Sequence, residues 1–290
     1  MSLIKSIGEK KVNLDFNKDF ISIFSDKIKS ADIQFINQTL KDLHPSDVAN
    51  LIENLSYDTR AKLIEIEEFD IDPEIFIEIN ESIQSEVLQL LSDDSIAKIL
   101  KRLESDNSIA ILENLDSKKK TAVLDKLPPK DRFLLEEGLS YPEDSAARIM
   151  QREFTAVPSD WSVGQTIDYL RESKDLPQEF LEIFVVDNDF KPIGIVPSSR
   201  VLRTPRDSKM KSIMREMPVM ISVNMDKEEV GHAFENYNLI SAGVVNKNNK
   251  LVGMITADDV VTVVQEEAEE DALRLAGVGN EEITDSVFVK

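Results

Sequence analysis

Residues 251–277 read LVGMITADDVVTVVQEEAEEDALRLAG, and the rest of the chain is best interpreted outward from this stretch. It begins as an apolar run, passes Asp258 and Asp259, and continues with helical periodicity. Between residues 258 and 282, nine acids stand against the single base Arg274, and like charges one turn apart disfavour a helix. The pattern therefore predicts a helix whose acidic face lies in water or receives cations. Its opposite face is predicted to be a packed apolar stripe, made of Val260, Val264, Ala268 and Ala272.

Length and charge narrow the classes of protein. The chain has 290 residues, which predicts about two domains, and a hydrophobic content of 41% that is ordinary for a globular protein. Its net charge of -21 at pH 7 is unusual. Such a charge argues against nucleic acid or an anionic membrane surface as a direct partner, because both repel an acidic protein. It favours cations or basic proteins as ligands.

Several kinds of site are disfavoured by what the sequence lacks. Without cysteine the chain has no disulfide, and a reducing, cytoplasmic setting is expected. Only His44 and His232 are histidines, so a histidine-rich zinc site is not expected. No apolar run has a length of about eighteen residues and no signal peptide is evident, so the chain as given is expected to be soluble. No nucleophile, base and acid follow a catalytic pattern, and we predict no enzymatic activity.

An apolar position recurs every twelve residues through the first half of the chain. Each unit reads as a polar turn with a capping residue and then two helical turns. Because such short units cannot bury their own apolar faces, residues 1–140 are predicted to form an all-α superhelix. Less regular helices are expected at 20–28 and 33–40. The recurring positions are Leu43, Leu55, a weak one at Glu67, Ile79, Leu91, Leu103, Leu115, Leu127 and Leu139. The capping candidates are Ser92, Asp93, Ser105, Asp116 and Ser117.

The pattern changes after residue 142. Two similar modules follow, each opened by an Ile-Met pair and each predicted as strand, helix, strand, strand and helix. The expected elements of the two modules lie at 155–158, 163–171, 183–186 and 191–196, and at 219–223, 227–237, 242–245 and 250–255. We divide the chain into residues 1–140, 141–203, 204–265 and an acidic helix and tail at 266–290.

Two motifs carry a resemblance to a known family. Residues 44–55, HPSDVANLIENL, resemble the HPxDxAxxxExL stretch in the N-terminal domain of the MgtE magnesium channels. Residues 141–150, YPEDSAARIM, are similar to that family's junction with its first CBS domain, except that Ala146-Ala147 stands where the family commonly has a glycine. The two modules look like a tandem pair of CBS domains. The resemblance covers residues 35–279 and implies an α+β multidomain fold: an all-α superhelical domain, an α/β CBS pair and an acidic connecting helix.

The resemblance also implies a function. In that family the connecting or plug helix leads into a transmembrane pore, so this chain would be the cytoplasmic portion of a membrane magnesium channel. It would form a homodimer through its CBS domains at the cytoplasmic face of the cell membrane. Mg²⁺, a hard cation that prefers oxygen ligands, would bridge acidic surfaces and close the pore when magnesium is plentiful. The ligands carried over are Asp94, Asp226, Glu228, Asp259, Glu267, Glu270 and Asp271, whereas two further family acids fall on Lys98 and Asn238 here.

A nucleotide is the alternative ligand. CBS domains commonly hold an adenine nucleotide such as ATP or AMP with a threonine and an aspartate just after the last strand, since these groups can bond phosphate and ribose. The second module has Thr256 and Asp259 there, and the first has Pro197 and Arg200. The alternative function is a soluble CBS adenine-nucleotide sensor that acts through its helical domain.

Overall fold

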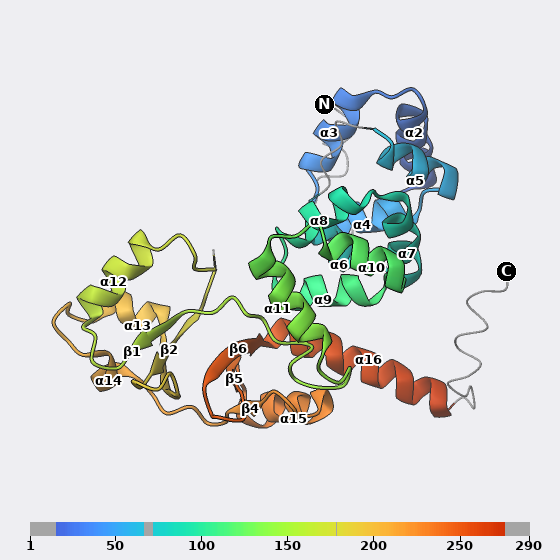
Figure 1. Ribbon diagram of the computed structural model, residues 1–290. Coiled ribbons are helices and arrows are strands. Elements are labelled where there is room, and N and C mark those ends of the chain that lie inside the picture. The colour runs from blue at the N-terminus through green and yellow to red at the C-terminus, as the bar shows by residue number, and fades with distance from the viewer. Residues whose placement is uncertain (1–15, 67–71, 178, 276–290) are drawn as a thin grey trace. The chain divides into compact units, whose positions relative to one another are not determined.

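The structure is a computed structural model that describes residues 16–66, 72–177 and 179–275, without the side chains of 269–271, 273 and 275. The chain divides into two compact units (Figure 1). The first comprises Met1–Leu103 and Asn107–Phe133, and the second comprises Glu104–Asp106 and Leu134–Lys290.

Short helices build the first half of the chain. From residue 45 the helices begin at residues 45, 57, 81, 93, 105, 117 and 129, with α6 falling in the interval where the repeat is weak. The predicted succession of short helices is confirmed, and so are the two less regular helices before it. The elements are α2 (Lys18–Lys29), α3 (Ile33–Lys41), α4 (Pro45–Glu53), α5 (Tyr57–Ile64), α6 (Glu74–Glu78), α7 (Glu81–Leu90), α8 (Asp93–Leu100), α9 (Ser105–Glu113), α10 (Ser117–Leu124) and α11 (Pro129–Leu139).

Two of the predicted caps are confirmed. Ser92 Oγ accepts the backbone N–H of the third residue of α8 at 3.1 Å, and Asp116 Oδ1 accepts two N–H groups of α10 at 2.9 and 3.0 Å. The other three candidates were wrong by one position. Asp93, Ser105 and Ser117 are the first residues of their helices, whereas an N-cap is the residue before the first.

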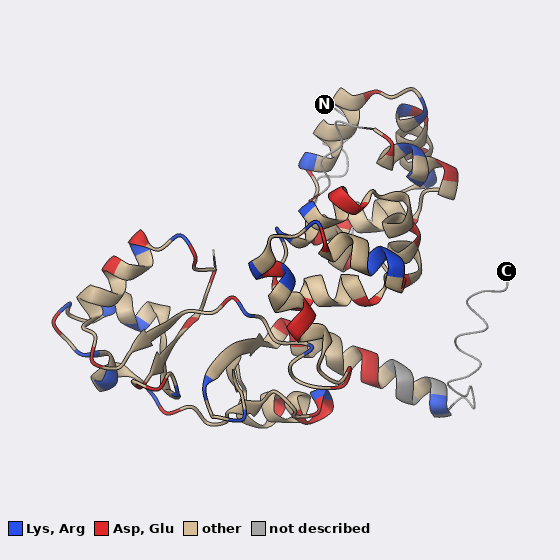
Figure 2. Cartoon of the chain, in the orientation of Figure 1, with Lys and Arg blue, Asp and Glu red and all other residues tan. Residues whose placement is uncertain are grey.

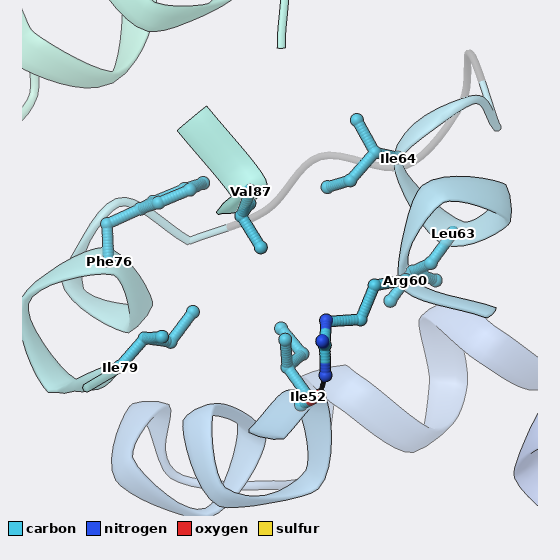
Figure 3. A pocket seen from close by; sticks show the side chains of 7 residues that line it. All are labelled: Ile52, Arg60, Leu63, Ile64, Phe76, Ile79 and Val87. Atoms are coloured by element: carbon cyan, nitrogen blue, oxygen red, sulfur yellow. Dashed lines mark hydrogen bonds between the residues drawn. The ribbon is translucent and has the colours of Figure 1, made fainter. Parts of the chain in front are cut away.

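Arg60 of α5 ties three helices of the first unit together. Its guanidinium pairs with both carboxylate oxygens of Glu86 on α7, at 2.6 and 3.0 Å, and donates to carbonyl oxygens at the C-terminal end of α4. Arg60 also lines a small apolar hollow of ≈ 250 Å³, open solvent included (Figure 3). Because its guanidinium is already engaged, the surface that lines the hollow is apolar. The other lining residues are Ile52, Leu63, Ile64, Phe76, Ile79 and Val87.

The second unit contains two three-stranded sheets of the same topology. In each, the first strand pairs parallel with the second, and the second pairs antiparallel with the third. The predicted plan of strand, helix, strand, strand and helix is confirmed twice (Figure 1). The elements are β1 (Ala156–Pro158), α12 (Val163–Glu172), β2 (Glu182–Val186), β3 (Pro192–Pro197), α13 (Ser198–Arg203), α14 (Met210–Ile213), β4 (Ile221–Ser222), α15 (Lys227–Tyr237), β5 (Ser241–Val245), β6 (Leu251–Thr256) and α16 (Ala257–Leu275).

The segment before the first strand of each module packs in the core of the other module. Ala146, Ala147 and Met150, which lie before β1, are fully buried in the apolar core of the second module. Met210, which lies before β4, is buried in the core of the first module. The N–H groups of Ala146 and Ala147 donate to carbonyl oxygens of the second module at 2.7 and 3.1 Å. The Ala-Ala pair therefore makes backbone contacts across the two modules.

A glycine in each third strand allows this close approach. A Cβ added at Gly253 would lie 2.8 Å from the Gln151 carbonyl oxygen, and one at Gly194 would lie 2.9 Å from the Arg215 carbonyl oxygen. Gln151 also exchanges two backbone hydrogen bonds with Met254, at 2.7 and 2.9 Å. The crossing segments are therefore held against their strands at a distance that excludes a methyl group.

We expect Gly253→Ala to lower the free energy of unfolding by about 1–3 kcal/mol, because the added methyl group overpacks this contact. Gly231→Ala in α15 is the matched control. Its Cβ would meet Val264 at an ordinary 3.4 Å, and alanine favours a helix over glycine by about 1 kcal/mol. Urea unfolding measures both, and equal stabilities of the two variants would contradict the close approach.

Candidate cation site

Two predicted acids lie at the start of α15. Asp226 is its N-cap, since Oδ1 accepts the backbone N–H of Glu228 at 2.9 Å. The exposed Glu228 side chain places Oε1 3.8 Å from Nε2 of His232. Both carboxylates lie at the positive end of the helix dipole, which stabilises them as anions. They are exposed and thus accessible to an ion from solution.

Lys227 gathers acids from two other segments. Its Nζ lies 3.7 Å from Oδ1 of Asp144, 3.8 Å from Oε2 of Glu266 and 4.0 Å from Oε1 of Glu267. We call these four residues the lysine-centred cluster. The predicted Glu267 is thus placed beside the start of α15, whereas Asp144, Glu266 and Lys227 were not predicted. The sequence signal was a lone base inside the run of acids from Asp226 to residue 229.

Asp259 is held at the start of α16 by Thr256. Its Oδ2 accepts the Thr256 hydroxyl at 2.6 Å and the Thr256 backbone N–H at 3.0 Å, and Gln151 Nε2 lies 3.4 Å away. These bonds cap the first turn of the helix. Burial raises the pKa of the Asp259 carboxyl and the charge of Asp258 adds to this, whereas the hydrogen bonds that Thr256 donates oppose it. The carboxylate therefore combines a structural role with a charge that is costly in its surroundings.

Asp259→Asn is expected to stabilise the ion-free chain near neutral pH by about 1 kcal/mol. The amide oxygen keeps an acceptor for Thr256, while the partly buried charge is removed. A carboxyl whose pKa is raised on folding destabilises the folded state at high pH, and this penalty disappears as the pH falls to the unfolded pKa. Urea unfolding with a chelator should show the advantage of the variant shrinking from about pH 7 to about pH 4. An advantage that does not change with pH would contradict this reading.

Asp94 lies in the first unit, exposed on α8. Its Oδ2 receives the Lys126 ammonium at 3.1 Å, so a lysine of the same unit already neutralises it. Lys98 is exposed one turn later on the same helix. Asn238 is the C-cap of α15 and has a φ of 49°, a left-handed conformation that asparagine tolerates better than most residues. Local backbone geometry thus accounts for Asn238.

The donor set fits a hydrated hard cation. Carboxylate oxygens are the ligands such an ion prefers, and Mg²⁺ usually keeps several waters. Among the side chains that the structure describes, no three carboxylates or histidines converge closely enough to form a metal cage. Glu270 and Asp271 also lie on α16, but their side chains are outside the described residues. The acids of α15 and of the first part of α16 are coloured red in Figure 2.

The predicted apolar stripe of α16 is wrong beyond its first turn. Val260 and Val263 are buried, whereas Val264 is 53% exposed and Ala268 and Ala272 are exposed. The reason is that the module surface ends while the helix continues past it (Figure 1). Of the helices in the described part of the chain, none is long and apolar enough to cross a bilayer.

The nucleotide candidates differ between the two modules. Thr256 and Asp259 are adjacent, as expected, but are hydrogen-bonded to one another. In the first module Pro197 directly precedes α13, and Arg200 donates from Nη1 to the Ile213 carbonyl oxygen at 2.9 Å. The equivalent position thus carries a carboxylate in one module and a guanidinium in the other.

Comparison with known proteins gives matches over most of the chain. Residues 43–144 match the MgtE intracellular N domain, and residues 146–207 and 210–266 match the CBS domain. The magnesium transporter MgtE of Enterococcus faecalis is 26% identical over 152 residues, 52% of this chain and 34% of that protein. That of Thermus thermophilus is 29% identical over 150 residues, 52% of this chain and 33% of that protein. The aligned part spans about a third of each relative's length.

Two solved structures share the fold. The soluble part of a magnesium transporter aligns with a TM-score of 0.74 at 21% identity, over 86% of this chain and 98% of that chain. The cytosolic domain of the Mg²⁺ channel MgtE in complex with ATP aligns with a TM-score of 0.75 at 23% identity, over 84% and 99%. The chain therefore carries an MgtE N domain followed by a CBS pair and is homologous to the MgtE magnesium transporters.

Proposed function

We propose that this chain is the magnesium-sensing regulatory region of an MgtE-type magnesium channel. The observation that carries the proposal is the lysine-centred cluster, where carboxylates of the segment before the first module and of α16 come together at the start of α15. A net charge of -21 makes such a meeting of acids unfavourable unless cations neutralise it. The role is regulatory rather than enzymatic.

In the proposed mechanism Mg²⁺ selects the compact arrangement of the chain. When Mg²⁺ is scarce, the carboxylates repel one another and the parts separate. When Mg²⁺ is plentiful, it binds between acidic surfaces and holds the pore closed. The ion shifts this equilibrium only by its differential affinity for the closed arrangement. The proposed ligands are Asp94, Asp226, Glu228, Asp259, Glu267, Glu270 and Asp271.

The proposal extends to the assembly. The end of α16 would lead to a transmembrane pore domain, which places this region at the cytoplasmic face of the membrane. A twofold pore would need a homodimer, and CBS pairs would supply the interface. Two exposed apolar side chains suit such an interface, Leu202 on α13 at 77% exposed and Val261 on α16 at 55%.

Titration calorimetry with MgCl₂ tests ion binding. The double variant Asp226→Asn, Glu267→Gln should bind Mg²⁺ about tenfold more weakly than the parent. Asparagine remains a good N-cap for α15, so its fold should persist. The matched control Asp175→Asn, Glu179→Gln changes two exposed acids of the first module and should alter affinity by less than about twofold, because distant exposed charges are screened. Equal losses of Mg²⁺ affinity in the two double variants would show that the effect comes from net charge alone, and would overturn the assigned ligands.

An adenine-nucleotide sensor is the second candidate function. It is favoured by the adjacency of Thr256 and Asp259 and by the ATP complex of the protein that shares this fold. Calorimetry with ATP and AMP separates the two functions. Nucleotide binding that Thr256→Ala abolishes, without any response to Mg²⁺, would replace the first proposal.

A further inference from the structure

One lysine occupies the place where the carboxylates of Asp144, Glu266 and Glu267 meet. The Lys227 ammonium lies at nearly equal distances, 3.7 to 4.0 Å, from carboxylates of Asp144, Glu266 and Glu267. It is thus shared by three anions rather than bonded tightly to one. Its side chain is only 21% exposed, although lysines are mostly exposed. A cation already stands at the centre of this cluster.

The backbone fixes Lys227 at this position. Its N–H donates to the Asp144 carbonyl oxygen at 2.8 Å, and it is the first residue of α15. A positive charge in the first turn of a helix is disfavoured by the helix dipole. The helix itself therefore gives no reason for a lysine here. The surrounding carboxylates supply the favourable term.

The distances also suit a hydrated ion. A magnesium ion that keeps its waters reaches a carboxylate oxygen through one of them, at about 4 Å. The ammonium stands at a similar distance from its three carboxylates. Lysine carries a compact, strongly hydrated charge on a flexible stem, so it can leave the cluster for solvent when another cation enters.

We propose that Lys227 is a tethered cation that competes with Mg²⁺ for Asp144, Glu266 and Glu267. This inference rests on the proposed sensing function and deepens it. At low Mg²⁺ the single ammonium offsets only one of the three carboxylate charges, so the cluster stays net negative and its carboxylates still repel one another. Mg²⁺ must displace the ammonium to bind, so Lys227 raises the Mg²⁺ concentration at which the sensor responds.

Calorimetry with MgCl₂ at constant ionic strength tests the competition. Lys227→Gln should bind Mg²⁺ about tenfold more tightly than the parent, because the competing charge is gone. Lys227→Met, which keeps the apolar stem, carries the same expectation, and Lys227→Arg should keep nearly the parental affinity. Lys247→Gln is the charge-matched control, an exposed lysine between β5 and β6, and should change affinity by less than about twofold.

The site itself is checked in the tighter-binding background. Adding Glu266→Gln to Lys227→Gln should abolish the gain, because a ligand of the cluster is lost. If the parent binds Mg²⁺ and the neutral variants of Lys227 bind no more tightly than Lys247→Gln, the tethered-cation inference is overturned while the sensing function stands. If neither the parent nor any variant binds Mg²⁺, both are overturned. Binding that appears only in Lys227→Gln and Lys227→Met would support the inference most strongly.

Discussion

Replacing Arg60 with methionine is expected to lower the free energy of unfolding of the first unit by about 3–5 kcal/mol. The guanidinium is almost buried, its side chain 9% exposed, and it bonds both Glu86 and the end of α4. Methionine keeps the length of the stem but bonds neither partner. The Glu86 carboxylate, 26% exposed, and the carbonyl oxygens of α4 would then lose a shared donor in a region with little water.

Arg132→Met is the matched control in the same unit. Arg132 pairs with Asp125 at the surface, where an ion pair contributes about 0–1 kcal/mol. Urea unfolding followed by circular dichroism compares the stabilities of the two variants. Because a chain of two units need not unfold in one step, the loss of stability is assigned to the unfolding transition whose midpoint shifts. An Arg60→Met chain as stable as Arg132→Met would show that the buried pair contributes little.

Arg215→Met is expected to destabilise the second unit by a similar amount, about 3–5 kcal/mol. Glu182, at the start of β2, is 3% exposed and is bonded by Arg215 and by the Ser241 hydroxyl at 2.7 Å. Arg215 lies before β4, the first strand of the second module, and Ser241 starts β5. Removal of the guanidinium would leave a buried carboxylate with a single neutral donor.

The same pair predicts an order of effects. Arg215 is half exposed, so water can solvate it when Glu182 is changed. Glu182→Gln should therefore cost less than Arg215→Met, about 1–2 kcal/mol, since the amide keeps an acceptor for Ser241. Arg203→Met, on the exposed surface of α13, should stay within about 0.5 kcal/mol of the parent. A larger loss for Glu182→Gln than for Arg215→Met would contradict the argument from burial.

Local patterns were sufficient to predict most elements of the fold. A twelve-residue apolar repeat places one short helix per unit, and Ser92 and Asp116 cap theirs because a side-chain oxygen can satisfy a free N–H close in sequence. The strands were recognisable as β-branched runs ended by polar turns. The repeat did not predict α6, because its apolar position at Glu67 is missing.

Contacts distant in sequence could not be predicted in this way. Nothing in the residues around Ala146 or Met210 indicates that the segment before the first strand of each module packs in the core of the other module. For the same reason the position of Lys227 among acids could not be predicted from the sequence. Its three partners, Asp144, Glu266 and Glu267, all lie more than thirty residues away along the chain. Periodicity also overestimated the length of the packed face of α16. It predicts which side of the helix is apolar but not where the surface against which the helix packs ends.

Small-angle X-ray scattering of this chain tests the central claim most directly. The radius of gyration should fall when millimolar MgCl₂ is added and should stay unchanged in NaCl of equal ionic strength, because bridging needs a divalent ion whereas screening does not. Asp226→Asn with Glu267→Gln should reduce the response, and Asp175→Asn with Glu179→Gln should leave it intact. A radius that does not change with MgCl₂, or that falls equally in NaCl, would contradict a magnesium-sensing role.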